Sequence, residues 1–330
     1  MRGLTLFASA LLTAAAAAPA HAELDRAAMI ALASGSVVKI EAVRGNGAFS
    51  LGSGVAIGVD RVVTNCHVTR DAQEIRIVRG SVRWRVQTQM SDAYHDLCVL
   101  KVPGLEAEPV KIGQAGALAI GQSVTALGYT GGIEIQSSGG EVLSLHRMDG
   151  ANVVQSSNFF NSGASGGGLF DDQLRLVGIL SFRLRGGEAH YFAAPSEWLL
   201  RQLADHDREH DAPVKPLDPK DLAFWQIPLD AQPMFLRAAV LERDNNWLAL
   251  EPLTQAWSQA DPTDPEPWYV MGLTFDRLGR SSAAVQALEC SLSIDPGYPP
   301  ARAQMAPMMQ RRAINQDTAV AALPCSAKPH

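Results

Sequence analysis

The chain has 330 residues, of which 47% are hydrophobic and 19% are charged, and its formal net charge is −6. This composition excludes a collagen-like chain and a chain that is disordered throughout. Phosphate binding needs clustered Lys and Arg, which the sequence lacks, so we expect no nucleic-acid partner. The length allows about two domains, because domains commonly contain roughly 100–200 residues.

The N-terminal segment 1–22 has the order of a secretory signal peptide. Arg2 precedes an apolar run over 4–18, and Pro19 and a small-residue pattern at 20–22 follow it, which predicts cleavage after Ala22. The run is short for a membrane span, and no later segment reaches the ~18–20 continuous apolar residues that a spanning helix needs. We therefore expect a periplasmic or secreted protein with no membrane span after cleavage. An uncleaved N-terminal anchor is the alternative.

A β-rich region follows, from about Val37 to Phe192. Short β-branched and apolar runs such as "SVVKIEAV", "SGVAIGV" and "LRLVGILSF" are separated by glycines. Many short strands with turn signals between them predict an all-β barrel or sandwich. In "APSEWLLRQLADHDREHD" apolar residues recur at three- and four-residue spacing, which predicts a helix that closes this domain. We place the domain at residues 23–205.

The C-terminal part of the chain is predicted to be helical. The stretch "APVKPLDPKD" is rich in proline and charge and predicts a linker, placed at 206–222. The helical region covers 223–314, and a tail covers 315–330. Six residues fall at the offsets of a tetratricopeptide unit: Trp268, Gly272, Phe275, Ala284, Leu288 and Pro296. A degenerate copy would begin near Met234, and an ordinary helical hairpin docked on the β domain is the alternative.

Tetratricopeptide-type repeats present a concave surface to peptides or partner proteins. The helical region is therefore a candidate site for recruiting substrate or a partner. The alternative is that it merely covers the β domain.

Three stretches of the β region each carry a residue type used in nucleophilic catalysis. "VVTNCHV" contains His67, "HDLCVLKV" contains Asp96, and "NSGASGGGLF" contains Ser165. The order His, Asp, Ser along the chain matches one known order of a serine hydrolase triad. His67 would accept the Ser165 proton, and Asp96 would orient the imidazole. Asp92 is a rival acid, but Asp96 adjoins the apolar strand and is preferred.

The glycines around Ser165 have a predicted role of their own. A tetrahedral intermediate needs two donors aimed at its oxyanion, and the backbone N–H groups of Gly163 and Ser165 are the candidates. A side chain at position 163 would hinder the conformation that turns both amides inward.

These stretches resemble the trypsin-like serine proteases, in particular the bacterial HtrA (Deg) branch. The matching stretches lie between positions 52 and 199 and read "GSGVAI", "TNCHV", "DLCVLKV", "GASGGGLF", "LVGILSF" and "FAAPSEWL". The resemblance implies two packed six-stranded β-barrels with the triad in the cleft between them. It also implies that Ser181 lies on the strand that pairs with the substrate backbone. HtrA proteins usually continue into a PDZ domain, which this sequence lacks; the tetratricopeptide-like region stands in its place.

Two departures from the digestive trypsin-like enzymes carry further expectations. Ala164 stands where those enzymes carry the Asp that a freed N-terminus engages, so we expect no zymogen cleavage. Phe159 stands where an enzyme that cleaves after Arg or Lys would carry Asp. We therefore expect an apolar specificity pocket, lined by some of Phe159, Phe160 and Ala194, that prefers small or medium apolar side chains.

Four cysteines are candidates for disulfides, which export permits. Cys66 precedes His67 and Cys98 lies shortly after Asp96, so contact between His67 and Asp96 would bring the two cysteines close. A Cys66–Cys98 disulfide follows as a hypothesis, with two buried free thiols as the alternative. By elimination Cys290 would pair with Cys325.

The sequence thus predicts an exported serine endopeptidase that acts on polypeptides, including unfolded proteins, through an acyl-enzyme. No cofactor is expected, and no metal site, because His95, His146 and His190 lack ligand spacing with cysteines or carboxylates. Two alternatives stay open. One is a non-catalytic peptide-binding or chaperone-like protein, and the other is an esterase that uses the same triad.

Overall fold

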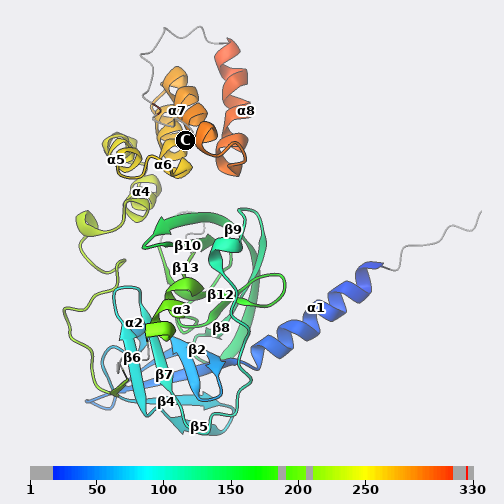
Figure 1. The fold of residues 1–330 in the computed structure, drawn as a ribbon, viewed down its shortest axis with the longest axis vertical. Helices are drawn as coiled ribbons and strands as arrows, with labels where there is room; N and C mark the ends of the chain where they lie inside the picture. Colours follow the sequence, from blue (N-terminus) through cyan, green and yellow to red (C-terminus); the bar gives the residue numbers. More distant parts are fainter. Residues whose placement is uncertain (1–17, 185–190, 206–210, 315–324, 326–330) are drawn as a thin grey trace, which may run out of the picture.

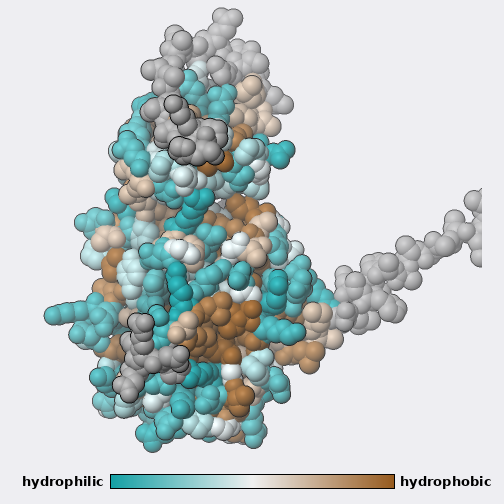
Figure 2. Space-filling model, viewed as in Figure 1, coloured by the Kyte–Doolittle hydropathy of each residue, from teal (hydrophilic) through white to brown (hydrophobic). Residues whose placement is uncertain are grey.

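The computed structural model describes residues 18–184, 191–205, 211–314 and Cys325. Its β-rich half carries the helical region, α4 to α8, at one end, while helix α1 (Ala18–Ser34) projects from the side (Figure 1). On the face drawn in Figure 2 the largest apolar area lies over the β half. No helix in the described part of the chain is both long enough and apolar enough to cross a bilayer.

The first sheet of the β half contains eight strands, in the order β14-β6-β7-β3-β2-β1-β4-β5. Strands β5 and β6 lie toward opposite ends of this order but are joined by a very short connection, so the sheet rolls into a half-barrel. The strands are β1 (Val37–Arg44), β2 (Phe49–Gly58), β3 (Arg61–Thr64), β4 (Ala72–Arg79), β5 (Val82–Arg85), β6 (Thr88–Asp92), β7 (Leu97–Lys101) and β14 (Ala212–Pro213).

The second sheet closes into a six-stranded barrel in the order β10-β13-β12-β11-β8-β9. Strand β12 is buried along all but its last residue, so it carries apolar residues on both faces rather than alternating with polar ones. The strands are β8 (Ser123–Thr130), β9 (Glu134–Met148), β10 (Ala151–Ser156), β11 (Gly168–Phe170), β12 (Leu176–Arg183) and β13 (Tyr191–Pro195).

The predicted fold class, a mainly β protease-type domain followed by a helical region, is confirmed. The halves differ in detail from the expected pair of six-stranded barrels, because only the second closes. In the first, β14 extends the edge at β6 by pairing Ala212 with Gln89 and Pro213 with Thr88. Part of the predicted linker therefore packs as a strand on the β half.

Five helices form the described C-terminal region, and two pairs of them repeat at the expected interval. The interval between the first residues of α5 and α7 is the same as that between the first residues of α6 and α8. This interval equals the ~34-residue length of a tetratricopeptide unit. The tetratricopeptide identity of the region stays a prediction. The helices are α4 (Met234–Arg243), α5 (Trp247–Ala260), α6 (Pro265–Arg277), α7 (Ser281–Ile294) and α8 (Pro299–Ile314).

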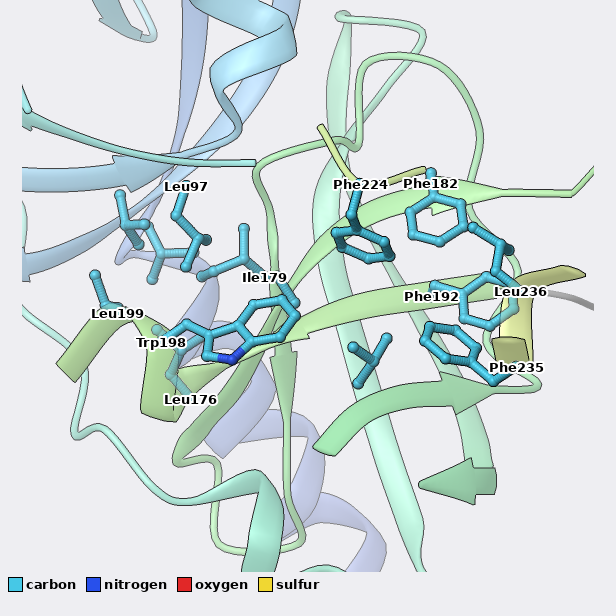
Figure 3. Close-up of a cluster of buried hydrophobic side chains, with 14 of the residues drawn as sticks. Leu97, Leu176, Ile179, Phe182, Phe192, Trp198, Leu199, Phe224, Phe235 and Leu236 are labelled. Carbon is cyan, nitrogen blue, oxygen red and sulfur yellow. The ribbon is translucent and has the colours of Figure 1, made fainter. Parts of the chain in front are cut away.

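A cluster of buried aromatic rings joins the barrel to the helical region (Figure 3). Phe182 of β12 stacks on Phe192 of β13 at 4.7 Å, and Phe224, which follows β14, lies 5.7 Å from Phe182. Phe235 of α4 lies 6.3 Å from Phe192. Aromatic side chains bury large apolar areas, so this cluster holds α4 against the second barrel.

Both predicted disulfides are present. Cys66 is bonded to Cys98, with their Cα atoms 4.9 Å apart, and Cys290 of α7 is bonded to Cys325. The described chain therefore contains no free cysteine.

Candidate active site

His67 and Asp96 meet at the end of the first sheet. His67 lies on the short helix α2 (Cys66–Thr69), which follows β3, and Asp96 immediately precedes β7. Strands β3 and β7 are paired, which brings the two residues together. The His67 Nδ1 atom lies 2.8 Å from Asp96 Oδ2, and the His67 backbone N–H donates to Asp96 Oδ1 at 2.9 Å. Both oxygens of one buried carboxylate thus orient the imidazole.

The backbone of Asp96 has an unusual conformation, with φ of 60°. A left-handed conformation costs a non-glycine residue roughly 1–2 kcal/mol. Surrounding hydrogen bonds hold it, because the Asp96 carbonyl accepts from Asn65 Nδ2 at 3.0 Å and from the Cys66 N–H at 3.3 Å. The Cys66–Cys98 disulfide links residues on either side of this contact.

Ser165 lies in the loop before β11, and its hydroxyl donates to the Ser181 carbonyl of β12 at 3.3 Å. Among the described residues it forms no hydrogen bond with His67. The Ser181 hydroxyl in turn donates to Asp96 Oδ2 at 2.6 Å. Ser181 therefore connects Ser165 to the His67–Asp96 pair.

The N–H groups of Gly163 and Ser165 have no hydrogen-bond acceptor within the described part of the chain. Gly163 has φ of 94°, and a Cβ there would overlap the Tyr129 carbonyl oxygen, so this position requires glycine. Two neighbouring backbone donors without an acceptor are the arrangement that can stabilise an oxyanion.

Ser53 of β2, in the first sheet, holds this loop through hydrogen bonds, and the sequence analysis did not single it out. Its N–H donates to the Ser165 carbonyl at 2.8 Å, and its hydroxyl donates to the Gly163 carbonyl at 2.7 Å. The same hydroxyl accepts from the Tyr129 N–H at 2.7 Å. Ser53 is fully buried, so these backbone groups, rather than water, satisfy its N–H and its hydroxyl.

The rival acid Asp92 makes a different contact. Its Oδ2 lies 2.6 Å from His95 Nδ1, and His95 Nε2 lies 3.2 Å from Asp149 Oδ2. Burial opposes protonation of His95, but the hydrogen bond and charge of Asp92, with those of Asp149, raise its pKa above the ordinary value. No contact in the described part of the chain joins Asp92 to His67.

The three residues expected to line the specificity pocket occupy different environments. Phe159 is 58% exposed, whereas Phe160 and Ala194 are buried. Phe160 packs on Tyr191 with ring centroids 4.9 Å apart, and Ala194 lies on β13. The apolar pocket stays a prediction.

Trp225 is a second residue at this site that the sequence analysis did not single out. Its ring lies 5.4 Å from the His67 ring in an edge-on arrangement and stacks on Phe182 at 5.0 Å with an interplanar angle of 15°. Most of the β domain separates Trp225 from His67 along the chain. No local pattern in the sequence indicates that the two residues are in contact.

Comparison with known proteins gives this arrangement a family context. Residues 52–179 match the family described as "Trypsin-like peptidase domain". The mouse protein "Serine protease HTRA4" (Mus musculus) is 29% identical over 192 residues, which cover 54% of this chain and 39% of that protein. The "Probable periplasmic serine endoprotease DegP-like" of Ectopseudomonas mendocina is 36% identical over 162 residues, which cover 46% of this chain and 34% of that protein. The chain spans less than half the length of these relatives.

Solved structures agree on the fold. The serine endoprotease from Yersinia pestis is 25% identical, with a TM-score of 0.51 and coverage of 56% of this chain and 68% of that chain. The Rv3671c protease from M. tuberculosis in its active form is 22% identical, with a TM-score of 0.52 and coverage of 67% of this chain and 99% of that chain. The second likeness supports the fold alone.

Proposed function

The chain carries a trypsin-like peptidase domain related to the HtrA and DegP-like serine proteases, and from this premise we propose that it is an exported serine endopeptidase. His67 would act as base, Asp96 as its orienting acid and Ser165 as nucleophile. One observation carries the proposal: two donors of His67, its Nδ1–H and its backbone N–H, meet the two oxygens of the buried Asp96. This contact leaves Nε2 as the nitrogen that can accept a proton.

In the proposed reaction Ser165 Oγ turns from the Ser181 carbonyl to His67 and attacks the scissile carbonyl carbon. His67 takes the hydroxyl proton, and the N–H groups of Gly163 and Ser165 stabilise the oxyanion. The C–N bond then breaks, and the amine leaves with the proton from His67. Water, deprotonated by His67, releases the acyl group and restores Ser165.

We propose polypeptides, including unfolded proteins, as the substrates, with small or medium apolar side chains preferred at the cleavage site. The related proteins are named serine proteases and endoproteases, which supports peptide bonds as the target. Substrate would pair with the end of β12 that carries Ser181. Export to the periplasm or beyond is proposed from the signal-peptide pattern and from the periplasmic name of the DegP-like relative. Recruitment of a partner by the helical region remains part of the proposal.

The test combines an active-site probe with a protein substrate. We expect a fluorophosphonate to label the purified protein and an unfolded protein to be cleaved, and we expect Ser165→Ala to lose both. Binding of unfolded protein without labelling would contradict the enzyme and favour a peptide-binding protein. Labelling and ester cleavage without peptide cleavage would favour an esterase.

A further inference from the structure

The segment between β14 and the helical region passes directly beside the helix that carries His67. Arg70, which follows that helix, accepts a hydrogen bond from the Leu217 N–H at 2.8 Å through its carbonyl. Its guanidinium donates to the carbonyls of Asp218 and Pro219 at 3.3 and 2.8 Å. Further along the segment Phe224 forms a second anchor, because its N–H donates to the Tyr94 carbonyl at 2.9 Å.

Trp225 follows this second anchor, and its position is held on several sides. The residue before it, Phe224, is 1% exposed and belongs to the aromatic cluster of Figure 3. The Trp225 carbonyl accepts from Gln232 Nε2 at 3.1 Å, and the same amide donates to the Ile227 carbonyl at 2.8 Å. The Trp225 Nε1 atom is buried and has no hydrogen-bond partner among the described residues. Packing against Phe182 and His67 therefore sets the orientation of the indole.

The indole lies against the ring of His67, the proposed base. Successive side chains of an extended peptide point to opposite faces. If the residue whose carbonyl is attacked pairs near Ser181 and directs its side chain into the apolar pocket, the preceding residue points the other way. Phe182 follows Ser181 on β12, and His67 shares the Asp96 carboxylate with the Ser181 hydroxyl. The two rings that Trp225 contacts therefore lie beside this pairing point, and they are the surface that the second side chain would meet.

We propose that Trp225 is a specificity-determining residue that closes the subsite for the second residue before the scissile bond. The subsite then accepts glycine or alanine and rejects branched and aromatic side chains. This inference rests on the proposed endopeptidase function, and it adds a substrate requirement that the motifs around His67, Asp96 and Ser165 do not contain. The segment around Phe224 would then contribute to substrate selection, because it holds Trp225 in place.

The test uses peptides that differ only at this second position, with glycine, alanine, leucine or phenylalanine. In the wild-type protein we expect kcat/KM to be highest for glycine and alanine. Trp225→Ala should raise kcat/KM for leucine relative to glycine by about tenfold or more, since a single extra or missing methylene group in a hydrophobic pocket already changes selectivity by about 10–200-fold. Trp225→Val should give an intermediate change and supplies the measurement if Trp225→Ala does not fold.

Trp247→Ala is the matched control, because Trp247 lies on α5 and contacts Arg277 rather than the site. It should keep the wild-type leucine-to-glycine ratio. A ratio that is the same in the wild type and in both Trp225 variants, with Ser165 still labelled by fluorophosphonate, would overturn the subsite alone. Absence of labelling in the wild type would overturn this inference together with the proposed function.

Discussion

Asp96 forms more hydrogen bonds than any other residue discussed at the candidate site. Its carboxylate meets His67 through two donors and accepts from the Ser181 hydroxyl, and it is fully buried. Charge-assisted hydrogen bonds are stronger than neutral ones, and a buried carboxylate needs them. Replacing one carboxylate oxygen by an amide NH2 group keeps the shape of the side chain. It also places a hydrogen-bond donor opposite groups that are themselves donors.

We expect Asp96→Asn to lower kcat by about 10⁴-fold while the protein stays folded, because the amide would favour the wrong imidazole tautomer. Peptide hydrolysis by purified protein at fixed pH measures the effect. Asp92→Asn is the matched control, since Asp92 pairs with His95, and it should change kcat by much less. If the Asp92 variant shows the larger loss, the assignment of the acid is wrong.

Strand β2 and the loop before β11 are connected by the hydrogen bonds of a single residue, Ser53. Ser53 connects its strand to the carbonyls of Gly163 and Ser165, the residues that supply the two candidate oxyanion donors. The strand belongs to the first sheet and the loop leads into the second barrel, so this contact couples the two halves. A buried backbone group that loses its partner costs about 1–3 kcal/mol.

We expect Ser53→Ala to reduce kcat more than it changes KM, by about 10-fold or more, because the Gly163 carbonyl and the Tyr129 N–H both lose a buried partner. Steady-state kinetics with one peptide measures the split. Ser53→Cys, which keeps a weak donor, should recover part of the activity. Equal losses of kcat in the two variants would indicate a packing effect instead.

For the whole molecule, a titratable cluster lies between the second barrel and the helical region. His146 of β9 stacks on Phe235 of α4 at 4.4 Å, and its Nδ1 lies 2.8 Å from Glu266 Oε1 of α6. Burial opposes protonation of His146, but the charge of Glu266 raises its pKa above the ordinary value. Burial and the nearby Glu266 charge raise the pKa of Glu242 to about 7, and that of Asp264 to about 6.

These three shifts have the same consequence for stability. Each group binds a proton more tightly in the folded protein than in the unfolded chain. Its contribution to the free energy of unfolding is therefore fully present at low pH and is lost as the pH rises through the folded pKa. For Glu242 the window extends from its ordinary pKa of 4.5 to about 7. Across this window the free energy of unfolding falls by up to about 1.4 kcal/mol per pH unit for one proton.

We expect Glu242→Gln to raise the urea midpoint at pH 8 and to flatten its dependence on pH between 5 and 8, because the variant cannot acquire the charge whose formation desolvation and Glu266 oppose. Urea unfolding at several pH values provides the measurement. Glu289→Gln is the control, since Glu289 is exposed on α7. A wild-type midpoint that rises with pH over this range would contradict the prediction.

The sequence alone determined the features that are encoded locally. Short runs of β-branched residues specify strands, and "NSGASGGGLF" predicts the special backbone around Gly163, because glycine conformations are a property of single residues. The pairing of His67 with Asp96 was also predictable, since it follows from three recognisable stretches. The contacts of Ser53, Trp225 and the His146 cluster were decided only by the tertiary structure. They join residues from different sheets and helices, and such packing depends on how whole apolar surfaces come together rather than on any pattern of neighbours along the chain.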